Sequence, residues 1–282
     1  MTETAISAVP LIPREVLFGN PERTQPRLSP GGDRLAYIAP VDGVLNVWVG
    51  PVGPNVGGDG FEPVTRDTDR GIRLFFWPED GRHLVYLQDK GGDENWRLHA
   101  VDPGTKEVRD LTPFENVQAR LLERNRGFPN ELLVELNQRD SQLHDVYRLN
   151  LATGDLELVV ENPGNVAGWV ADADMRVRGA LRAYSDGGFG LIVRKTEEDD
   201  WREVLRWGPE DSLNSGPVGF SEHGARVFLK DSREANAARL VSLDLSTEEV
   251  EILAEDPEYD VSDVLVHPDT REVQAAAFRR AR

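Results

Sequence analysis

Short apolar runs separated by polar turns recur along the whole chain. Within the runs, apolar residues alternate with polar ones, as at Leu84 and Tyr86 or at Trp96 and Leu98. This is the period of a β-strand that is buried on one face. Clusters of Asp, Gly, Asn and Pro lie between the runs at hairpin spacing, and these residues adopt the backbone angles of tight turns at the lowest cost. The pattern therefore predicts short antiparallel strands joined by hairpins.

Three sequence markers recur with a common period of about 47 residues. The first is a polar turn followed by an apolar residue, at Gly32–Leu35, Gly81–Leu84, Asn130–Leu133, Asp174–Val177, Gly224–Val227 and Thr270–Val273. The second is an aspartate about ten residues downstream, at Asp42, Asp89, Asp140, Asp186 and Asp231. The third is an apolar–polar–x–x–Thr turn, at Val101–Thr105, Leu149–Thr153 and Leu243–Thr247. Three independent markers that share one period indicate a structural repeat.

Each repeat unit predicts four short strands. Three are visible directly, and the fourth is the apolar stretch before each first turn, such as Val166–Trp169 or Val218–Phe220. A repeat of this length with four strands is typical of a β-propeller blade, because one such sheet cannot bury both faces and radial stacking covers them. A helical solenoid would need a 3.6-residue period, and a β-sandwich would leave the shared period unexplained. The predicted fold class is all-β, a propeller of four-stranded blades.

The repeats also suggest how the chain is divided. Residues 1–24 form an N-terminal segment with a short helix, in which Pro13 suits the first turn, Val16–Phe18 is apolar and Gly19 can end the helix. Residues 25–282 hold five full units and the opening hairpin of a sixth, Val264–Phe278. Seven blades would need on the order of 330 residues. We therefore expect an incomplete propeller, truncated from seven blades; the alternative is a short ring closed by its N-terminal segment.

Charge and composition narrow the function classes. Fifty acidic residues against 32 basic ones give a formal net charge of −18, which disfavours nucleic acid and anionic membrane surfaces as partners. The absence of cysteine excludes disulfides, thiolate nucleophiles and Cys-ligated metal sites. No apolar run approaches the roughly 20 residues of a membrane span. The first residues lack the pattern of a signal peptide, so a cytoplasmic location is expected.

Several segments resemble a known family. Ile12–Pro21, Pro26–Tyr37 and Leu45–Trp48 are similar to the opening of prolyl-oligopeptidase-type serine peptidases, which carry a β-propeller in front of an α/β-hydrolase domain. Asp89–Asn95 followed by Trp96–Asp102 resembles the acylaminoacyl-peptidase-like members. The later units match a generic TolB-like propeller pattern. The resemblance implies a noncatalytic propeller region whose partners are a peptide substrate and the hydrolase domain of the same parent chain.

The chain departs from this family in its chemistry. The resembled catalytic domain needs a nucleophilic serine in a GxSxG elbow, followed by an acid and a histidine. No GxSxG occurs in the 282 residues, so no catalytic residue is predicted and this chain alone is expected to show no peptidase activity. The alternative function is a stand-alone TolB-like propeller that acts as a protein-binding scaffold. Open blade edges predict a tendency to self-association.

The sequence contains only weak signals for metal or cofactor sites. The five histidines occupy different places within their units, so we expect surface or turn positions rather than a metal cluster: His83, His99, His144, His223 and His267. The loop Asp89–Asn95 lacks the alternating order of a calcium loop, and its side chains are expected to cap the backbone. No metal or cofactor site is predicted.

Two further sets of residues invite a functional interpretation. Dipeptidyl-peptidase relatives bind a substrate amine with paired glutamates, but Glu197–Glu198 and Glu248–Glu249 lie where solvated loops are expected and match no such motif. The six tryptophans are interleaved with acidic residues, which argues against base stacking. We expect them to pack between sheets: Trp48, Trp77, Trp96, Trp169, Trp201 and Trp207.

Overall fold

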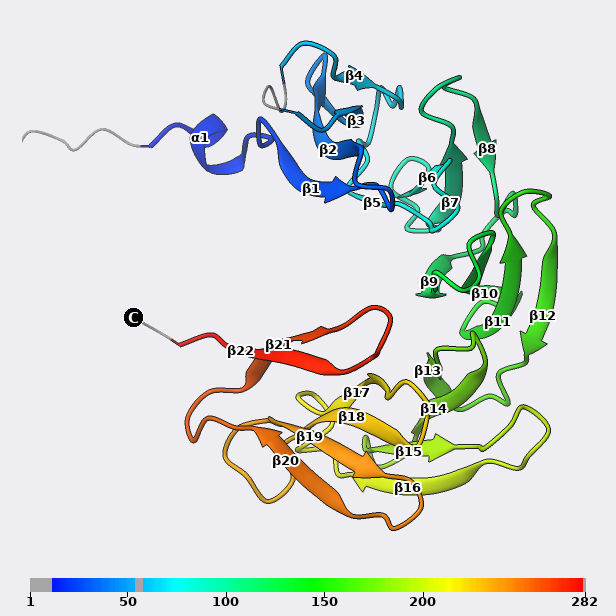
Figure 1. Ribbon diagram of the computed structural model, residues 1–282, viewed down its shortest axis with the longest axis vertical. Coiled ribbons are helices and arrows are strands. Elements are labelled where there is room, and N and C mark those ends of the chain that lie inside the picture. Colours follow the sequence, from blue (N-terminus) through cyan, green and yellow to red (C-terminus); the bar gives the residue numbers. More distant parts are fainter. Residues whose placement is uncertain (1–11, 54–57, 281–282) are drawn as a thin grey trace, which may run out of the picture.

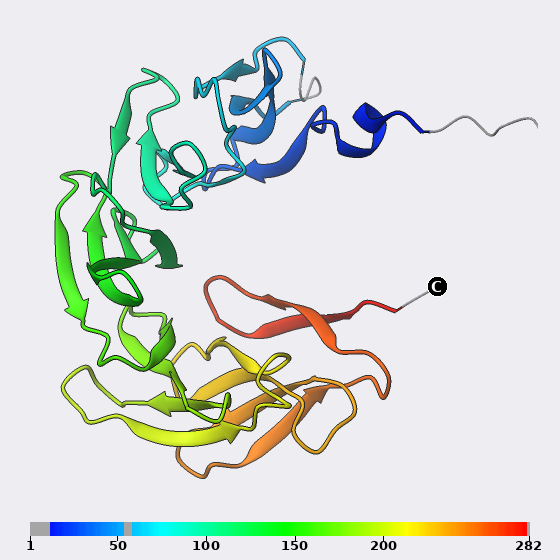
Figure 2. The same ribbon diagram turned by 180° about the vertical axis from the view of Figure 1, so that it is seen from behind.

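The computed structural model describes residues 12–53 and 58–280. In these residues, five four-stranded antiparallel sheets and one two-stranded sheet follow one another around an open centre. The first strand of each sheet lies nearest the centre and the last lies at the outside (Figure 1; seen from behind in Figure 2). This confirms the predicted all-β propeller of four-stranded blades. The seven-blade total stays a prediction.

The blades follow the sequence repeat. The first holds β1 (Thr24–Leu28), β2 (Arg34–Val41), β3 (Val44–Pro51) and β4 (Glu62–Pro63), and the second holds β5 (Leu74–Phe76), β6 (Leu84–Gln88), β7 (Arg97–Val101) and β8 (Val108–Asp110). The third holds β9 (Ala119–Glu123), β10 (Glu131–Asp140), β11 (Leu143–Asn150) and β12 (Leu156–Val160). The fourth holds β13 (Val166–Ala171), β14 (Val177–Ala183), β15 (Phe189–Val193) and β16 (Arg202–Trp207). The fifth holds β17 (Gly216–Phe220), β18 (Arg226–Asp231), β19 (Arg239–Asp244) and β20 (Val250–Ala254), and a hairpin of β21 (Val261–Val266) and β22 (Val273–Phe278) follows.

The predicted N-terminal helix is present as α1 (Arg14–Phe18), and Val16 and Phe18 expose 70% and 81% of their surface. The predicted first strands of the fourth and fifth blades are β13 and β17. In the part of the chain that the structure describes, no helix is both long enough and apolar enough to cross a membrane.

The strand order gives the propeller two different faces. Because neighbouring strands are antiparallel, the first strand of every blade starts at the face where the fourth strand ends. The connections between blades (64–73, 111–118, 161–165, 208–215 and 255–260) therefore share one face with the middle hairpin turns. We call this the linker face; α1 leads into β1 there. The first and third hairpin turns of each blade lie on the opposite face.

The core lies between the blades. Four clusters of buried apolar side chains each combine residues from two consecutive sheets. Strand β10 shows the division: Leu132, Val134 and Leu136 pack toward the second blade, whereas Leu133 packs toward the fourth. Alternate side chains of one strand thus fill two interfaces, which is the packing that radial stacking requires.

The tryptophans pack largely as expected. Trp77, Trp169 and Trp207 are buried within the clusters, and Trp96 and Trp201 pack against them. Trp48 is half-buried, and its indole N–H donates to a backbone carbonyl of the same blade.

Arginines connect each blade to the next on the opposite face. A guanidinium of one blade donates to a backbone carbonyl in a hairpin turn of the following blade, with nitrogen–oxygen distances of 2.6 to 3.2 Å. We call these contacts the arginine ties; they join Arg34 to Gly81, Arg109 to Ala152, Arg148 to Met175, Arg178 to Gly224 and Arg202 to Leu245. Each of the four interfaces between the five described full blades contains at least one such tie.

The turn of the β21–β22 hairpin contacts the third blade. Arg271 pairs with Glu123 of the third blade at 3.2 Å, and Asp269 pairs with Arg126 at 3.4 Å.

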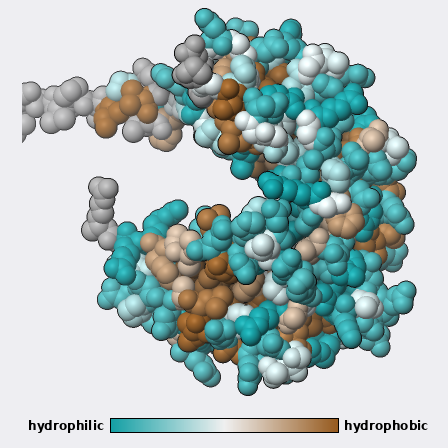
Figure 3. All heavy atoms as spheres, viewed as in Figure 1, coloured by the Kyte–Doolittle hydropathy of each residue, from teal (hydrophilic) through white to brown (hydrophobic). Residues whose placement is uncertain are grey.

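Most of the surface visible in Figure 3 is hydrophilic, and its largest apolar area lies over the fifth blade. Self-association through open edges stays a prediction.

Candidate functional site

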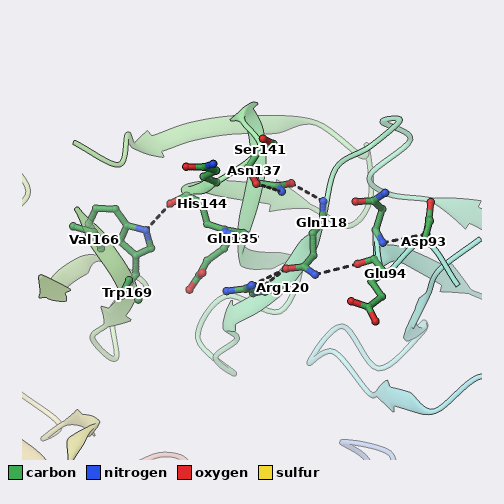
Figure 4. A pocket seen from close by; sticks show the side chains of 14 residues that line it. Asp93, Glu94, Gln118, Arg120, Glu135, Asn137, Ser141, His144, Val166 and Trp169 are labelled. Atoms are coloured by element: carbon green, nitrogen blue, oxygen red, sulfur yellow. Dashed lines mark hydrogen bonds between the residues drawn. The ribbon is translucent and has the colours of Figure 1, made fainter. Parts of the chain in front are cut away.

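A cavity of about 360 Å³ opens on the linker face between the third and fourth blades. Three parts of the chain form it: the β6–β7 turn with Asp93 and Glu94, the strands β9 to β11, and the start of β13. Figure 4 shows their side chains converging on one space. All three parts reach the cavity because strand starts and middle turns share this face.

Two opposite charges stand side by side in the cavity. Arg120 on β9 and Glu135 on β10 are direct cross-strand partners, so their side chains leave the same side of the sheet. Glu135 also follows Leu133 in the alternation of β10 and therefore faces the fourth blade. Such a pair would ordinarily form a salt bridge. Here, however, no described Arg, Lys or His nitrogen lies within 4.0 Å of the Glu135 carboxylate.

The Arg120 guanidinium is held elsewhere. Its Nε and Nη2 both donate to Gln118 Oε1, at 3.0 and 2.7 Å. Gln118 in turn donates through its side-chain amide to the Glu94 carbonyl at 3.0 Å, and its backbone N–H donates to Asn137 Oδ1 at 2.6 Å. These bonds join the second blade to the third and hold the Arg120 guanidinium against Gln118 (Figure 4).

Burial gives Glu135 an unusual acidity. Its residue surface is only 8% exposed. Burial raises the pKa of the Glu135 carboxyl from its ordinary value of 4.5 to about 7, and Arg120 and a backbone N–H of Trp169 oppose only part of that rise. A buried carboxyl without a salt-bridge partner, at the wall of a cavity, is a feature of ligand sites more often than of structural cores.

His144 and Trp169 complete the wall beside Glu135. Burial, with a smaller contribution from the positive charge of Arg120, lowers the pKa of His144 to about 4, so the imidazole is neutral near pH 7. Its Nε2 is buried and has no partner among the described residues. The Trp169 indole N–H donates to the His144 carbonyl at 2.9 Å and so ties the third blade to the fourth.

The side chains that line this cavity differ from those of a metal site. Among the described residues, no group of three or more His, Asp or Glu side chains is placed to hold a metal ion. The cavity instead offers three carboxylates, those of Asp93, Glu94 and Glu135, one guanidinium and several neutral polar groups around a small volume.

A larger cavity of about 820 Å³ lies on the opposite face between the fourth and fifth blades. It is lined by Arg178, Arg194 and Arg202 among others, but each of these guanidiniums donates to at least one backbone carbonyl. Arg178 and Arg202 also form arginine ties. This cavity is therefore better explained as part of the blade interface than as a ligand site.

The structure brings together residues that the sequence analysis treated separately. His144, Trp169 and the loop Asp89–Asn95 meet at the linker-face cavity. The loop also caps the backbone as expected, since Asp93 Oδ1 accepts from the N–H groups of Lys90 and Asn95. Of the five histidines only His223 is fully exposed, whereas the other four are half-buried.

The remaining candidates lie elsewhere. Both glutamate pairs are exposed on hairpin turns of the opposite face, and Glu248 pairs with Arg202. Sequence reasoning missed Glu135 and Arg120. The one available signal was a carboxylate inside the apolar run Leu132–Leu136, where a charged residue needs a reason.

The fold, built from radially stacked four-stranded sheets, defines a β-propeller. Oligopeptidase B from Leishmania major is a solved structure with this architecture: the TM-score is 0.60 at 11% identity, over 87% of this chain and 37% of that one. TolB from Acinetobacter baumannii also aligns, with a TM-score of 0.50 at 15% identity over 84% of this chain and 55% of that one. At these identities the likeness concerns the fold.

Sequence similarity goes further. The chain is 39% identical to dipeptidyl aminopeptidase BIII of Pseudoxanthomonas mexicana over 273 residues, which is 96% of this chain and 39% of that protein. It is 27% identical to dipeptidyl peptidase family member 6 of Caenorhabditis elegans over 286 residues, 95% of this chain and 38% of that protein. No family model matches. The chain spans about two fifths of the length of these curated relatives. Its similarity to peptidases agrees with the resemblance seen in its opening residues.

Proposed function

We propose that this chain is the propeller region of a prolyl-oligopeptidase-type serine peptidase and restricts the access of peptides to a hydrolase domain of the same protein. The observation that carries the proposal is the 39% identity to a dipeptidyl aminopeptidase over nearly the whole chain. The relative is more than twice as long as the matched region, which leaves room there for a hydrolase domain. In this proposal residues 1–24 are the N-terminal segment and 25–282 the propeller.

The topology supports a particular arrangement. A segment that precedes β1 and a segment that follows a fourth strand both join the propeller at the linker face. A hydrolase domain attached through either connection would therefore face the cavity that contains Glu135. A peptide held in that cavity would lie between the propeller and the hydrolase domain. The ring would exclude folded proteins by size.

A domain exchange tests the proposal. The matched region of dipeptidyl aminopeptidase BIII is replaced by residues 1–282, and the chimaera is compared with the same hydrolase domain lacking any propeller. We expect the chimaera to cleave a dipeptidyl p-nitroanilide, and to cleave a denatured protein far more slowly than the propeller-free form does. Labelling by a fluorophosphonate shows that both hydrolase domains are folded. Equal cleavage of the long substrate by the two proteins would refute gating and favour the scaffold alternative.

The chain by itself provides a second measurement. Because it contains no GxSxG elbow, we expect residues 1–282 to release no p-nitroaniline from the same substrate.

A further inference from the structure

The turn of the β21–β22 hairpin contains a histidine whose imidazole accepts two backbone hydrogen bonds. His267 Nδ1 accepts from the N–H groups of Asp269 and Thr270, at 3.2 and 3.1 Å. The His267 backbone closes the same turn, since its N–H donates to the Glu272 carbonyl at 2.8 Å and its carbonyl accepts from the Arg271 N–H at 2.9 Å. The imidazole therefore helps to fix the part of the turn that carries Asp269 and Arg271.

The corresponding turns of two other blades use a hydroxyl in place of this imidazole. In the first and fifth blades the equivalent residue is Ser29 or Ser221, whose N–H also donates to the carbonyl five residues later. In both turns the serine Oγ accepts from a backbone N–H. A hydroxyl keeps its acceptor near neutral pH, whereas an imidazole nitrogen accepts only while it carries no proton. Imidazole ordinarily changes its charge between about pH 5 and 8, so among these three turns only that of β21–β22 should respond to pH.

The same turn attaches the hairpin to the third blade by two ion pairs. The pair of Arg271 with Glu123 is half-buried, and the pair of Asp269 with Arg126 is exposed. Both pairs need a backbone that directs the Asp269 and Arg271 side chains toward the third blade. That backbone is the segment whose N–H groups bond to the imidazole. The hydrogen bonds of the turn and the contact between blades are therefore coupled.

We propose that protonation of His267 releases the β21–β22 hairpin from the third blade, so that this contact is closed near pH 8 and open near pH 5.5. The proton turns the acceptor at Nδ1 into a donor, which then faces two N–H groups instead of bonding to them. The positive imidazole also competes with Arg126 for the carboxylate of Asp269. The proposal does not rest on the proposed function, because the hairpin would detach in the same way in a chain that restricts no peptide.

Other charged groups surround this turn and could influence the same contact. They lie on the turn itself, on the third blade that it approaches and on the second blade behind Arg126: Asp269, Arg271 and Glu272; Glu123 and Arg126; and Glu79, which lies 3.5 Å from Arg126. Carboxylates and guanidiniums ordinarily keep their charge between pH 5.5 and 8. The change in this range is therefore assigned to the imidazole.

Double electron–electron resonance on residues 1–282 tests the proposal. The chain contains no cysteine, so Glu157→Cys on β12 of the third blade and Gln274→Cys on β22, both at exposed positions, place two spin labels across the contact. We expect one narrow distance distribution at pH 8 and a broader, longer one at pH 5.5. The ratio of open to closed molecules should rise about tenfold or more, because two hydrogen bonds are lost. Circular dichroism at both pH values shows whether the fold is retained.

Two histidine variants in the labelled chain assign the cause. His267→Asn should stay closed at both pH values, because an amide does not titrate and Asn150 already makes the same two bonds in this chain. Its Oδ1 accepts from the N–H groups two and three residues later, at 2.9 and 3.1 Å. His223→Asn is the matched control, since His223 is exposed on the corresponding turn of the fifth blade. It should open at pH 5.5 as the unchanged chain does.

A third variant tests the ion pairs. Glu123→Gln combined with Asp269→Asn removes both pairs and should be open already at pH 8. If this variant stays closed, the ion pairs do not hold the hairpin and the proposal fails. An unchanged distance at pH 5.5 in the labelled chain would also overturn it. So would a change that persists in His267→Asn, because the pH dependence would then belong to another group, such as Glu135.

Discussion

The arginine tie from Arg178 to Gly224, one of two between the fourth and fifth blades, should be a major determinant of stability, and Arg178→Ala tests this. Arg178 is 7% exposed. Its Nε donates to the Arg194 carbonyl at 3.1 Å, its Nη2 donates to the Gly224 carbonyl at 3.2 Å, and its guanidinium lies 5.2 Å from the centre of the Phe220 ring. The alanine variant leaves two buried carbonyls without this donor.

The size of the effect follows from these contacts. Each hydrogen bond to a buried charged group is worth about 1.5–3 kcal/mol, and removing one partner of a buried ion pair costs about 3–5 kcal/mol. Asp172 lies 3.4 Å from Arg178 but keeps Arg176 at 3.2 Å, which limits the loss. We therefore expect the free energy of unfolding to fall by about 3–5 kcal/mol, the contributions not being additive.

Urea unfolding followed by tryptophan fluorescence measures this change. Arg206→Ala is the matched control in the same blade, since Arg206 pairs with Asp186 but both side chains are largely exposed, at 42% and 51%. An exposed pair contributes little, so the control should shift the unfolding midpoint far less. Equal midpoints for the two variants would refute the reasoning that ties to backbone carbonyls hold the blades together.

Three further predictions concern other parts of the propeller. Between pH 4.5 and 7 the folded state holds a proton on Glu135 that the unfolded chain has lost, so the free energy of unfolding falls as pH rises through this window. In urea unfolding, the stability of Glu135→Gln relative to the unchanged chain should therefore rise by up to about 3 kcal/mol from pH 4.5 to pH 8. A difference that does not change with pH would contradict the raised pKa of Glu135. Gly224 and Gly32 both have positive φ, 63° and 71°, but only at Gly224 would a new Cβ lie against Arg178. In the same assay, Gly224→Ala should therefore destabilise the protein more than Gly32→Ala. Equal losses would show that the guanidinium moves aside freely. By hydrogen exchange, β21–β22 should exchange faster than β10–β11, because its sheet has two strands only, and equal protection in a monomeric sample would count against this.

The fold could be predicted from the sequence because its main determinant is local. Alternation within short runs and turn residues at fixed offsets define a blade, and repetition at one period defines how blades stack. The N-terminal helix was likewise visible from Pro13, the apolar Val16–Phe18 and Gly19. Each of these signals lies within a few residues of the element it predicts.

The candidate site could not be predicted in the same way. Arg120 and Glu135 become partners through the register of β9 and β10, and a register shift between Leu133 and Val134 prevents that pairing from being counted out along the chain. His144 follows a second irregularity, between Leu136 and Asp140. Trp169 comes from another blade. The site depends on strand register and blade stacking together, and neither can be deduced from the spacing of residues along the chain.

The arginine ties have a consequence for how such a chain can evolve. Each tie takes its acceptor from the main chain, and a carbonyl remains whatever side chain the turn carries. Mutation can therefore remove a tie most directly at its donor, while the accepting turn is free to drift in sequence. A duplicated repeat would bring its own accepting turn, and in most blades its own donor as well. New blades could thus be added by copying a segment of the gene, without matched changes in their neighbours.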